Sequence, residues 1–431
     1  MKKVYLKDVK PYVDCEISGF VEKIREQKTM QFLVLKDSTS SIQVAIEKEK
    51  MPEISSVVST LTRQSVVRFV GRAIPQEKVT LRGMEFVPIS IEVDSRAEDL
   101  PIDEASSKEL KLDYRWIDLR QDKERLIFQI RTFVEMTMKE FITKEEFIEI
   151  HSSKISAQSS EGGAEVFAVD YYGQKAYLTQ SPQFYKQMAI ASGFDKVFEI
   201  GPIYRAEKSF TARHASEATC LDVEIGHIKT HHDVMDFEEK LLIYILTKIE
   251  EKFGEKIKEV FKEEVLVPVS IPRIKLSEVF KIFKDVYEID VPKSKQLDLD
   301  PEQEKLICEY SKQYLGSEAV FITDYPSEAR AFYSKKIDGS FDSLTFDLLY
   351  KGWEMSSGAV REHRYEELKT QIEEHGIKSE YLKDYLEFFR FGCPRHGGFG
   401  FGIDRFITKL LGLPSIKESI FIFRGPSRIR P

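Results

Sequence analysis

One segment constrains the fold of this chain more than any other: residues 198–226, with the sequence FEIGPIYRAEKSFTARHASEATCLDVEIG. The pattern indicates two strands joined by a basic turn. Arg205 and Glu207 lie two residues apart on the first strand, and Asp222 and Glu224 have the same spacing on the second. Side chains at this spacing point to one side of a sheet. Because buried charges need partners, the segment predicts a hairpin whose charged face binds a polyphosphate with its metal ions and a polar small substrate.

The composition is typical of a soluble globular protein with two or three domains: 431 residues, 42% hydrophobic and 32% charged. No apolar run approaches 18 residues and no signal-like N-terminus is present, so we expect a cytoplasmic protein without a membrane partner. The four cysteines are far apart and lack C-x-x-C spacing, which argues against a zinc site or a disulfide framework. The net charge of −8 gives no sign of nucleic-acid binding, although a local basic face remains compatible with it.

The N-terminal part indicates a small β-barrel. A helix over 53–64 fits between the third and fourth strands, which is the order of an OB-fold, a frequent binder of single-stranded nucleic acid. Phe32 and Gln43 would supply a stacking ring and a base-edge partner; for Phe32 the pattern alone favours the core. Arg25 precedes the second strand, in a loop that either meets phosphates or forms a solvated turn. The five predicted strands cover 13–24, 30–37, 41–47, 65–74 and 84–94.

A change of pattern divides the chain. Residues 95–111 are polar, contain Pro101 and show no periodicity, which is typical of a domain boundary. We predict a barrel over 1–97, a linker or hinge over 98–120 and a second domain over 121–431. In the second domain, hairpin-linked strands with helices grouped beside them indicate an α+β fold built on an antiparallel sheet. No P-loop or strand–GxGxxG–helix unit occurs, so an ATP site would lie outside those frameworks.

Five motifs follow one another along the second domain. They are FIEIHSSKI (147–155), TQSPQFYKQ (179–187), YRAEKSFTARH…LDVEIG (204–226), EMSSGAVREHR (354–364) and GFGFGIDR (398–405). Together they resemble the class II aminoacyl-tRNA synthetases of the aspartate, asparagine and lysine subgroup, most closely the aspartyl branch of the archaeal type. The resemblance covers nearly the whole chain. It implies a class II catalytic domain behind an anticodon-binding OB-fold, ATP and Mg²⁺, L-aspartate and tRNA(Asp) as substrates, and a homodimer.

The resemblance implies an ATP site built from charged side chains. Arg205 would hold the α-phosphate and the substrate carboxylate, and Glu207 would face the adenine amino group. The implied ATP-binding residues are Arg205, Glu207, Arg213, His214, Glu354, Gly402 and Arg405. Among them Arg205, Glu354 and Arg405 would be catalytic, and Mg²⁺ would be held by Glu354, Ser357 and Glu224. The alternative is a surface ladder of salt bridges.

A pocket for aspartate is implied beside the ATP site. Lys186 and Arg361 suit a carboxylate, since Arg binds it bidentately and Lys adds a point charge. A neutral asparagine amide would leave these cations underpaired, at a cost on the order of several kcal/mol. Taken without its motif, Lys186 would be an exposed helix residue. Gln183 and Glu161 would take the α-amino group, so that the implied pocket consists of Glu161, Gln183, Lys186, Arg205, Asp222, Ser357 and Arg361.

Several positions depart from the family pattern. Ser153 replaces a proline at the dimer interface, and Glu146 replaces a glycine. Ala218 stands where a phenylalanine ring usually stacks on adenine, a loss on the order of 1 kcal/mol. The charged catalytic groups are kept, so the departures leave room for a specialised paralogue.

Four functional hypotheses follow from these residues. The first is an aspartate–tRNA ligase for tRNA(Asp), with tRNA(Asn) open as a second substrate; Arg25, Phe32 and Gln43 would then contact anticodon bases. The second is a paralogue that passes aspartyl-adenylate to another acceptor, for which the N-terminal barrel would be superfluous. The third is an asparaginyl-tRNA synthetase. The fourth is a non-catalytic RNA-binding protein, against which the intact charged set argues.

Overall fold

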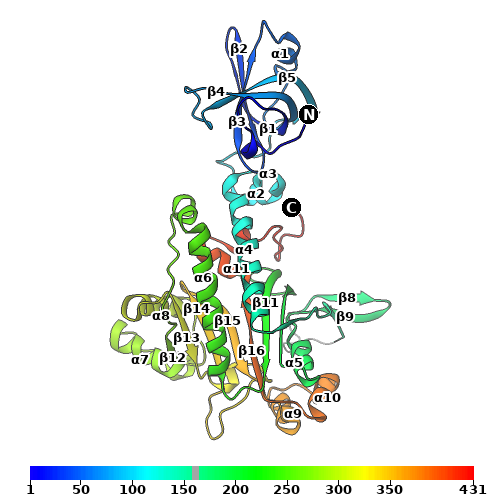
Figure 1. Ribbon diagram of the computed structural model, residues 1–431. Helices are drawn as coiled ribbons and strands as arrows, with labels where there is room; N and C mark the ends of the chain where they lie inside the picture. The colour runs from blue at the N-terminus through cyan, green and yellow to red at the C-terminus, as the bar shows by residue number, and fades with distance from the viewer. Residues whose placement is uncertain (158–164) are drawn as a thin grey trace. The chain divides into compact units, whose positions relative to one another are not determined.

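The computed structural model describes residues 1–157 and 165–431. The chain separates into two compact units, Met1–Leu110 and Lys111–Pro431 (Figure 1). Each unit has its own hydrophobic core. The division falls inside the segment 98–120 predicted as a linker. Part of that segment is helical, since α2 (Lys108–Asp113) and α3 (Arg115–Asp118) lie within it.

The first unit is a closed five-stranded barrel with strand order β1-β2-β3-β5-β4, which confirms the predicted fold of the N-terminal part. Alternate residues of each strand fill its core; on β2, for example, Gln31, Leu33 and Leu35 are fully buried. Phe32 therefore lies on the outer face, and its expected place in the core is wrong. The elements are β1 (Asp14–Glu26), β2 (Met30–Lys36), β3 (Ser41–Glu47), α1 (Pro52–Val58), β4 (Val66–Pro75) and β5 (Met84–Ser95), after a short 3-10 turn, η1 (Leu6–Asp8).

The second unit is built on an eight-stranded sheet in the order β12-β13-β14-β15-β16-β11-β10-β6. Its central strands are antiparallel and only the two outermost pairs are parallel, which confirms the predicted α+β class. The strands are β6 (Ile148–Glu149), β10 (Lys196–Tyr204), β11 (Glu217–Gly226), β12 (Arg273–Lys275), β13 (Ala319–Thr323), β14 (Thr345–Tyr350), β15 (Trp353–Val360) and β16 (His396–Gly402). A small second sheet contains β7 (Ile155–Ser156), β9 (Gln174–Leu178) and β8 (Ala168–Tyr171).

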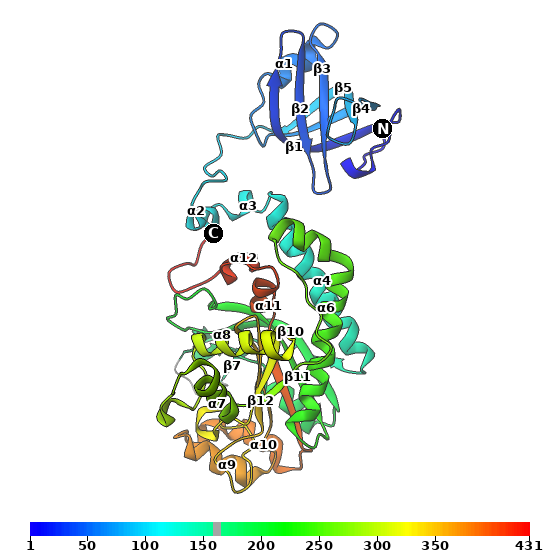
Figure 2. The same cartoon turned by 90° about the vertical axis from the view of Figure 1, so that its left-hand side faces the viewer.

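Two long helices cover one face of the large sheet. α4 (Asp122–Lys144) and α6 (His231–Phe261) run side by side in Figures 1 and 2, and their buried residues share one core with β11, β15 and β16. The other helices are α5 (Gln183–Ala191), α7 (Leu276–Tyr287), α8 (Pro301–Tyr310), α9 (Tyr365–Glu374), α10 (Lys383–Arg390), α11 (Ile403–Leu410) and α12 (Ile416–Ser419). The remaining turns are η2 (Lys293–Lys295), the π-helical η3 (Ser311–Leu315), η4 (Ser327–Ala329) and η5 (Ser379–Leu382).

The alternation of strand side chains leaves a charged face opposite these helices. On β11, Leu221 and Val223 enter the core, whereas Asp222 faces the other side, where a cavity begins. On β16 the core residues Phe399 and Phe401 alternate with glycines, and an added Cβ at Gly398 would lie only 1.9 Å from the carbonyl oxygen of Val223. The apolar residues of these strands pack into the core on one face of the sheet, and the glycines of β16 place no side chain on its other face.

Candidate active site

A cavity of about 300 Å³ lies over the charged face of β11 and β16. Lys186 on α5 places its Nζ atom 3.0 Å from Asp222 Oδ1 and 3.4 Å from Glu224 Oε2. Arg361, directly after β15, donates to both carboxylate oxygens of Glu224 at 3.0 and 3.3 Å. All four side chains are buried, so the exposed-helix alternative for Lys186 is wrong. The network joins three elements that are distant in sequence into one pocket.

Glu224 is held among cations. Burial raises its pKa, but Arg361 and Lys186 lower it more, and the net pKa lies below the ordinary value. Both carboxylate oxygens are engaged by these neighbours. This environment favours ion pairing over the predicted role in metal binding, which stays a prediction.

A second, adjoining cavity of about 100 Å³ brings together all seven residues predicted to bind ATP. It shares Arg205, Glu354 and Gly400 with the first cavity. Strand β10 ends at Tyr204, so Arg205 and Glu207 lie just beyond the strand on which the sequence pattern placed them. The described residues that line this cavity include Ala218 but no Phe, Tyr or Trp.

Charged contacts orient the side chains of this second cavity. Arg205 lies 3.6 Å from Glu207, and Arg405 donates to the backbone oxygen of Glu354 at 3.1 Å. Arg213 is bound to Glu304 of α8 at 2.7 Å. Burial, followed by the nearby Arg405, lowers the pKa of His214, which favours a neutral imidazole.

Oxygen ligands suitable for a divalent cation gather where the two cavities meet. Burial, followed by the nearby charge of Asp347, raises the pKa of Glu354 to about 7. The side chain is nevertheless 37% exposed. The register of β14 and β15 places Asp347 opposite Ser357. Carboxylate and hydroxyl oxygens suit Mg²⁺, and a carboxylate whose ionised form is disfavoured by burial gains from a cation. The described residues contain no cluster of three or more His, Cys, Asp or Glu side chains arranged for a metal.

The structure adds site residues that sequence reasoning missed. Arg330 donates to both oxygens of Asp347, at 2.9 and 2.6 Å, and to Ser357 Oγ at 3.2 Å. Its guanidinium also stacks over the Tyr325 ring at 3.5 Å. Asp347 had a detectable signal, because it is a lone carboxylate in the otherwise uncharged and fully buried strand β14. Arg330 had none in its local sequence.

The other residues predicted for the aspartate pocket are Gln183, Ser357 and Glu161. Gln183 is buried and lines the aspartate cavity together with Ser357. Glu161 lies outside the described residues.

The three residues predicted to meet anticodon bases lie together on the barrel. Arg25 donates to Gln43 Oε1 at 2.7 Å, and its guanidinium lies 5.5 Å from the Phe32 ring centroid. Glu85 on β5, which the sequence did not indicate, accepts from Gln43 Nε2 at 2.7 Å. The cluster offers a ring, an amide and two opposite charges on adjoining strands, a combination suited to unstacked bases.

The fold and the two cavities define a class of protein. Residues 107–423 match the family model of class II tRNA synthetases (D, K and N), and the chain belongs to this family. No helix among the described residues is long and apolar enough to cross a membrane.

Similar proteins cover the chain from end to end. It is 37% identical to the aspartate–tRNA(Asp/Asn) ligase of Methanopyrus kandleri over 100% of both chains, and 38% identical to the aspartate–tRNA(Asp) ligase of Pyrococcus abyssi over 96% of each. Among solved structures, asparaginyl-tRNA synthetase of Pyrococcus horikoshii with asparaginyl-adenylate matches with a TM-score of 0.92, 29% identity and full coverage of both chains. Aspartyl-tRNA synthetase of Entamoeba histolytica matches with a TM-score of 0.85 and 28% identity, covering 98% of this chain and 90% of that one.

Proposed function

We propose that this protein activates L-aspartate with ATP and transfers the aspartyl group to the 3′ end of tRNA(Asp). The observation that carries the proposal is the charge of the aspartate cavity. The lining carries four cations, Lys186, Arg205, Arg330 and Arg361, and two carboxylates, Asp222 and Glu354, which leaves a net charge of +2 (4 − 2). Aspartate carries a net charge of −1 and asparagine none. The names of the relatives in Methanopyrus kandleri and Pyrococcus abyssi support the same substrate.

The first step needs positioning and charge neutralisation more than covalent chemistry from the protein. The α-carboxylate of aspartate attacks the α-phosphorus of ATP, and pyrophosphate leaves. Arg205, which borders both cavities, would neutralise the charge that develops between the reactants. Glu354, helped by Ser357, would hold Mg²⁺, which when bound offsets the negative charge of the phosphate oxygens. Arg213 and Arg405 would meet the terminal phosphates.

Aspartate-dependent exchange between ATP and labelled pyrophosphate tests the activation step. We expect exchange with aspartate and a much weaker signal with asparagine; absence of exchange at millimolar ATP would overturn the proposal. Lys186→Ala should abolish aspartate activation while ATP still binds. If pyrophosphate exchange in this variant depends on aspartate concentration as in the wild type, the assignment of the pocket is wrong.

Charging of purified tRNA separates the ligase from a paralogue with another acceptor. tRNA(Asp) and tRNA(Asn) are compared side by side at fixed salt, because phosphate contacts make RNA affinity salt-dependent. The Methanopyrus kandleri relative is named for both tRNAs, so charging of tRNA(Asn) is the second candidate function. We also propose a homodimer in the cytoplasm; light scattering on the purified protein and cell fractionation test these two points.

A further inference from the structure

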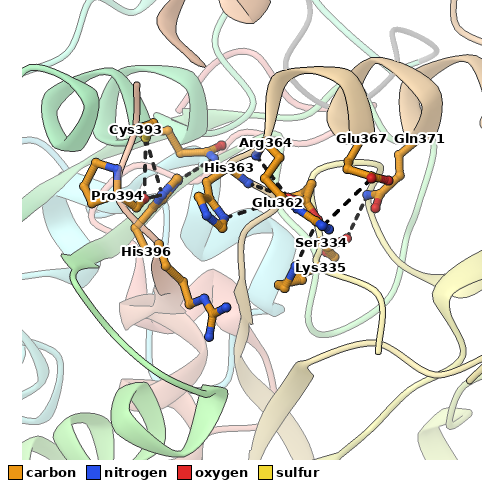
Figure 3. Close-up of polar contacts among 12 residues, drawn as sticks. Ser334, Lys335, Glu362, His363, Arg364, Glu367, Gln371, Cys393, Pro394 and His396 are labelled. Atoms are coloured by element: carbon orange, nitrogen blue, oxygen red, sulfur yellow. Dashed lines mark hydrogen bonds and ion pairs between the residues drawn. The ribbon is translucent and has the colours of Figure 1, made fainter. Parts of the chain in front are cut away.

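A buried chain of hydrogen bonds runs behind the aspartate cavity. We call it the amide relay; it consists of Gln183, Gln187 and His396. Gln183 Nε2 donates to Gln187 Oε1 at 2.9 Å, and Gln187 Nε2 lies 2.9 Å from His396 Nε2. The relay ends at the backbone oxygen of Pro394, 2.8 Å from His396 Nδ1, where Figure 3 shows the ring beside Cys393 and Pro394. All three side chains are buried, with exposed fractions of 3%, 0% and 0%.

The Pro394 oxygen gives the relay its direction. A carbonyl oxygen only accepts hydrogen bonds, so His396 Nδ1 carries a proton. In the neutral ring Nε2 is then an acceptor, and Gln187 must turn its amide nitrogen toward it. This leaves Gln187 Oε1 facing Gln183 and the hydroxyl of Tyr385, which also donates to it at 2.9 Å.

The surroundings of His396 favour the neutral ring. Burial is the largest cause and lowers its pKa, and Arg361 lowers it further, whereas Glu224 and Glu362 act in the opposite direction. The thiol of Cys393, 3.7 Å from Nδ1, is itself protonated because burial raises its pKa to about 12. Among the described residues, no charged group is hydrogen-bonded to the His396 ring.

The direction of the relay decides which atom Gln183 presents to the substrate. Its Nε2 is used by Gln187, and its Oε1 has no hydrogen-bond partner within the described part of the chain. Gln183 lines the same cavity as Lys186 and Arg361. An amide oxygen accepts from an ammonium group, whereas an amide nitrogen would place a donor against a donor.

We propose that Gln187 and His396 are positioning residues that hold the Gln183 amide with its oxygen toward the α-amino group of bound aspartate. The inference rests on the proposed function, which supplies the substrate. Reversing the relay requires a second proton on His396, because Gln187 Oε1 would then need a donor at Nε2. The buried imidazole thus selects the orientation of an amide that it does not touch.

Kinetics of three variants test this role. Gln187→Leu frees Gln183 to rotate, so the aspartate KM should rise at least tenfold, which corresponds roughly to the free energy of one hydrogen bond to a charged group. The ATP KM should stay within about twofold. Gln187→Glu keeps acceptor oxygens toward Gln183 and Tyr385, and its charge favours a second proton on His396 that Nε2 can donate to it, so this variant should restore the aspartate KM to within about threefold of the wild type. Tyr385→Phe is the matched control, because it removes a donor to Gln187 without changing the direction set by His396.

The outcomes separate this inference from the proposed function. If the wild-type protein shows no aspartate-dependent exchange, the proposed function fails. If it does, and Gln187→Leu keeps the wild-type aspartate KM or changes both KM values equally, the positioning role is wrong. Histidine-selective ¹⁵N NMR of the wild-type protein, assigned with His396→Gln, gives an independent answer that does not depend on the folding of Gln187→Leu. The proton must be on Nδ1 of a neutral His396 ring; a proton on Nε2 overturns the relay.

Discussion

At the scale of single residues, the cavity predicted to bind ATP has no Phe, Tyr or Trp ring among its described lining residues. Ala218 lies opposite Ile203 in the β10–β11 ladder, and the described lining contains no large ring. Ala218→Phe adds a stacking surface worth on the order of 1 kcal/mol, so the ATP KM should fall about fivefold. The aspartate KM should stay unchanged and serves as the control. An unaltered ATP KM would mean that adenine is held elsewhere in the cavity.

Glu362 supplies a residue-scale prediction about pH. Figure 3 shows it between Lys335 and Arg364, at 3.1 and 2.8 Å. Burial raises its pKa, but Arg364 and Lys335 outweigh burial and lower it from 4.5 to about 2. Because the folded pKa is depressed, the stabilisation is present above pH 4.5 and is lost as the pH falls toward 2.

Glu362→Gln should therefore cost about 2 kcal/mol in the free energy of unfolding at neutral pH, and the difference from wild type should shrink below pH 4.5. Denaturant unfolding at several pH values measures this. Glu367→Gln is the matched control, because Glu367 is exposed and lies 3.8 Å from Arg364. A constant difference across the pH range would contradict the assignment.

At the scale of elements, the end of α4 explains why a glycine is usual at position 146. Phe147 N donates to Ile142 O, and Glu146 N donates to Thr143 O, the hydrogen bonds of a Schellman motif. This motif needs a left-handed residue, and Glu146 has φ of 66°. Glu146→Gly should raise stability by about 0.5–1 kcal/mol, since the relieved strain exceeds the added entropy of the unfolded chain.

Thermal unfolding checks this prediction, with an expected rise in Tm of about 1–3 °C. Glu145→Gly is the control. Glu145 has φ of −85°, so a glycine there gains no conformational relief and should lower the Tm. Equal shifts in the two variants would show that strain at position 146 is unimportant.

The elements also show which features of the site the sequence patterns predict and which they do not. Alternation on β11 was sufficient to predict its charged face, because core residues and site residues alternate within one segment. Arg205 and Glu207, predicted on the first strand, lie just beyond the end of β10. Asp347 and Ser357 became neighbours only through the register of β14 and β15, which no local pattern specifies. Phe32 was misjudged because Gln31 takes the inner position, where Glu26 and Ser59 accept hydrogen bonds from its amide nitrogen. A rule based on hydrophobicity misplaces a polar residue that is buried and hydrogen-bonded, as Gln31 is.

At the scale of the whole molecule, each unit buries its own apolar residues. The barrel core draws only on residues 4–93, and the main core of the second unit only on residues 126–413. All described residues that line the two catalytic cavities belong to the second unit. We therefore predict that activation of aspartate can be separated from the proposed recognition of the anticodon by the barrel.

A fragment covering residues 105–431, which retains α2 (Lys108–Asp113), should keep aspartate-dependent pyrophosphate exchange within about tenfold of the full chain, because its core and cavities are complete. Charging of tRNA(Asp) should fall much further, by on the order of a hundredfold or more in kcat/KM, since the Arg25–Phe32–Gln43 cluster is absent. In the full chain, Phe32→Ala should reproduce only the loss of charging. If the fragment folds but loses exchange and charging to the same extent, the barrel contributes to the chemistry itself and the separation proposed here is wrong.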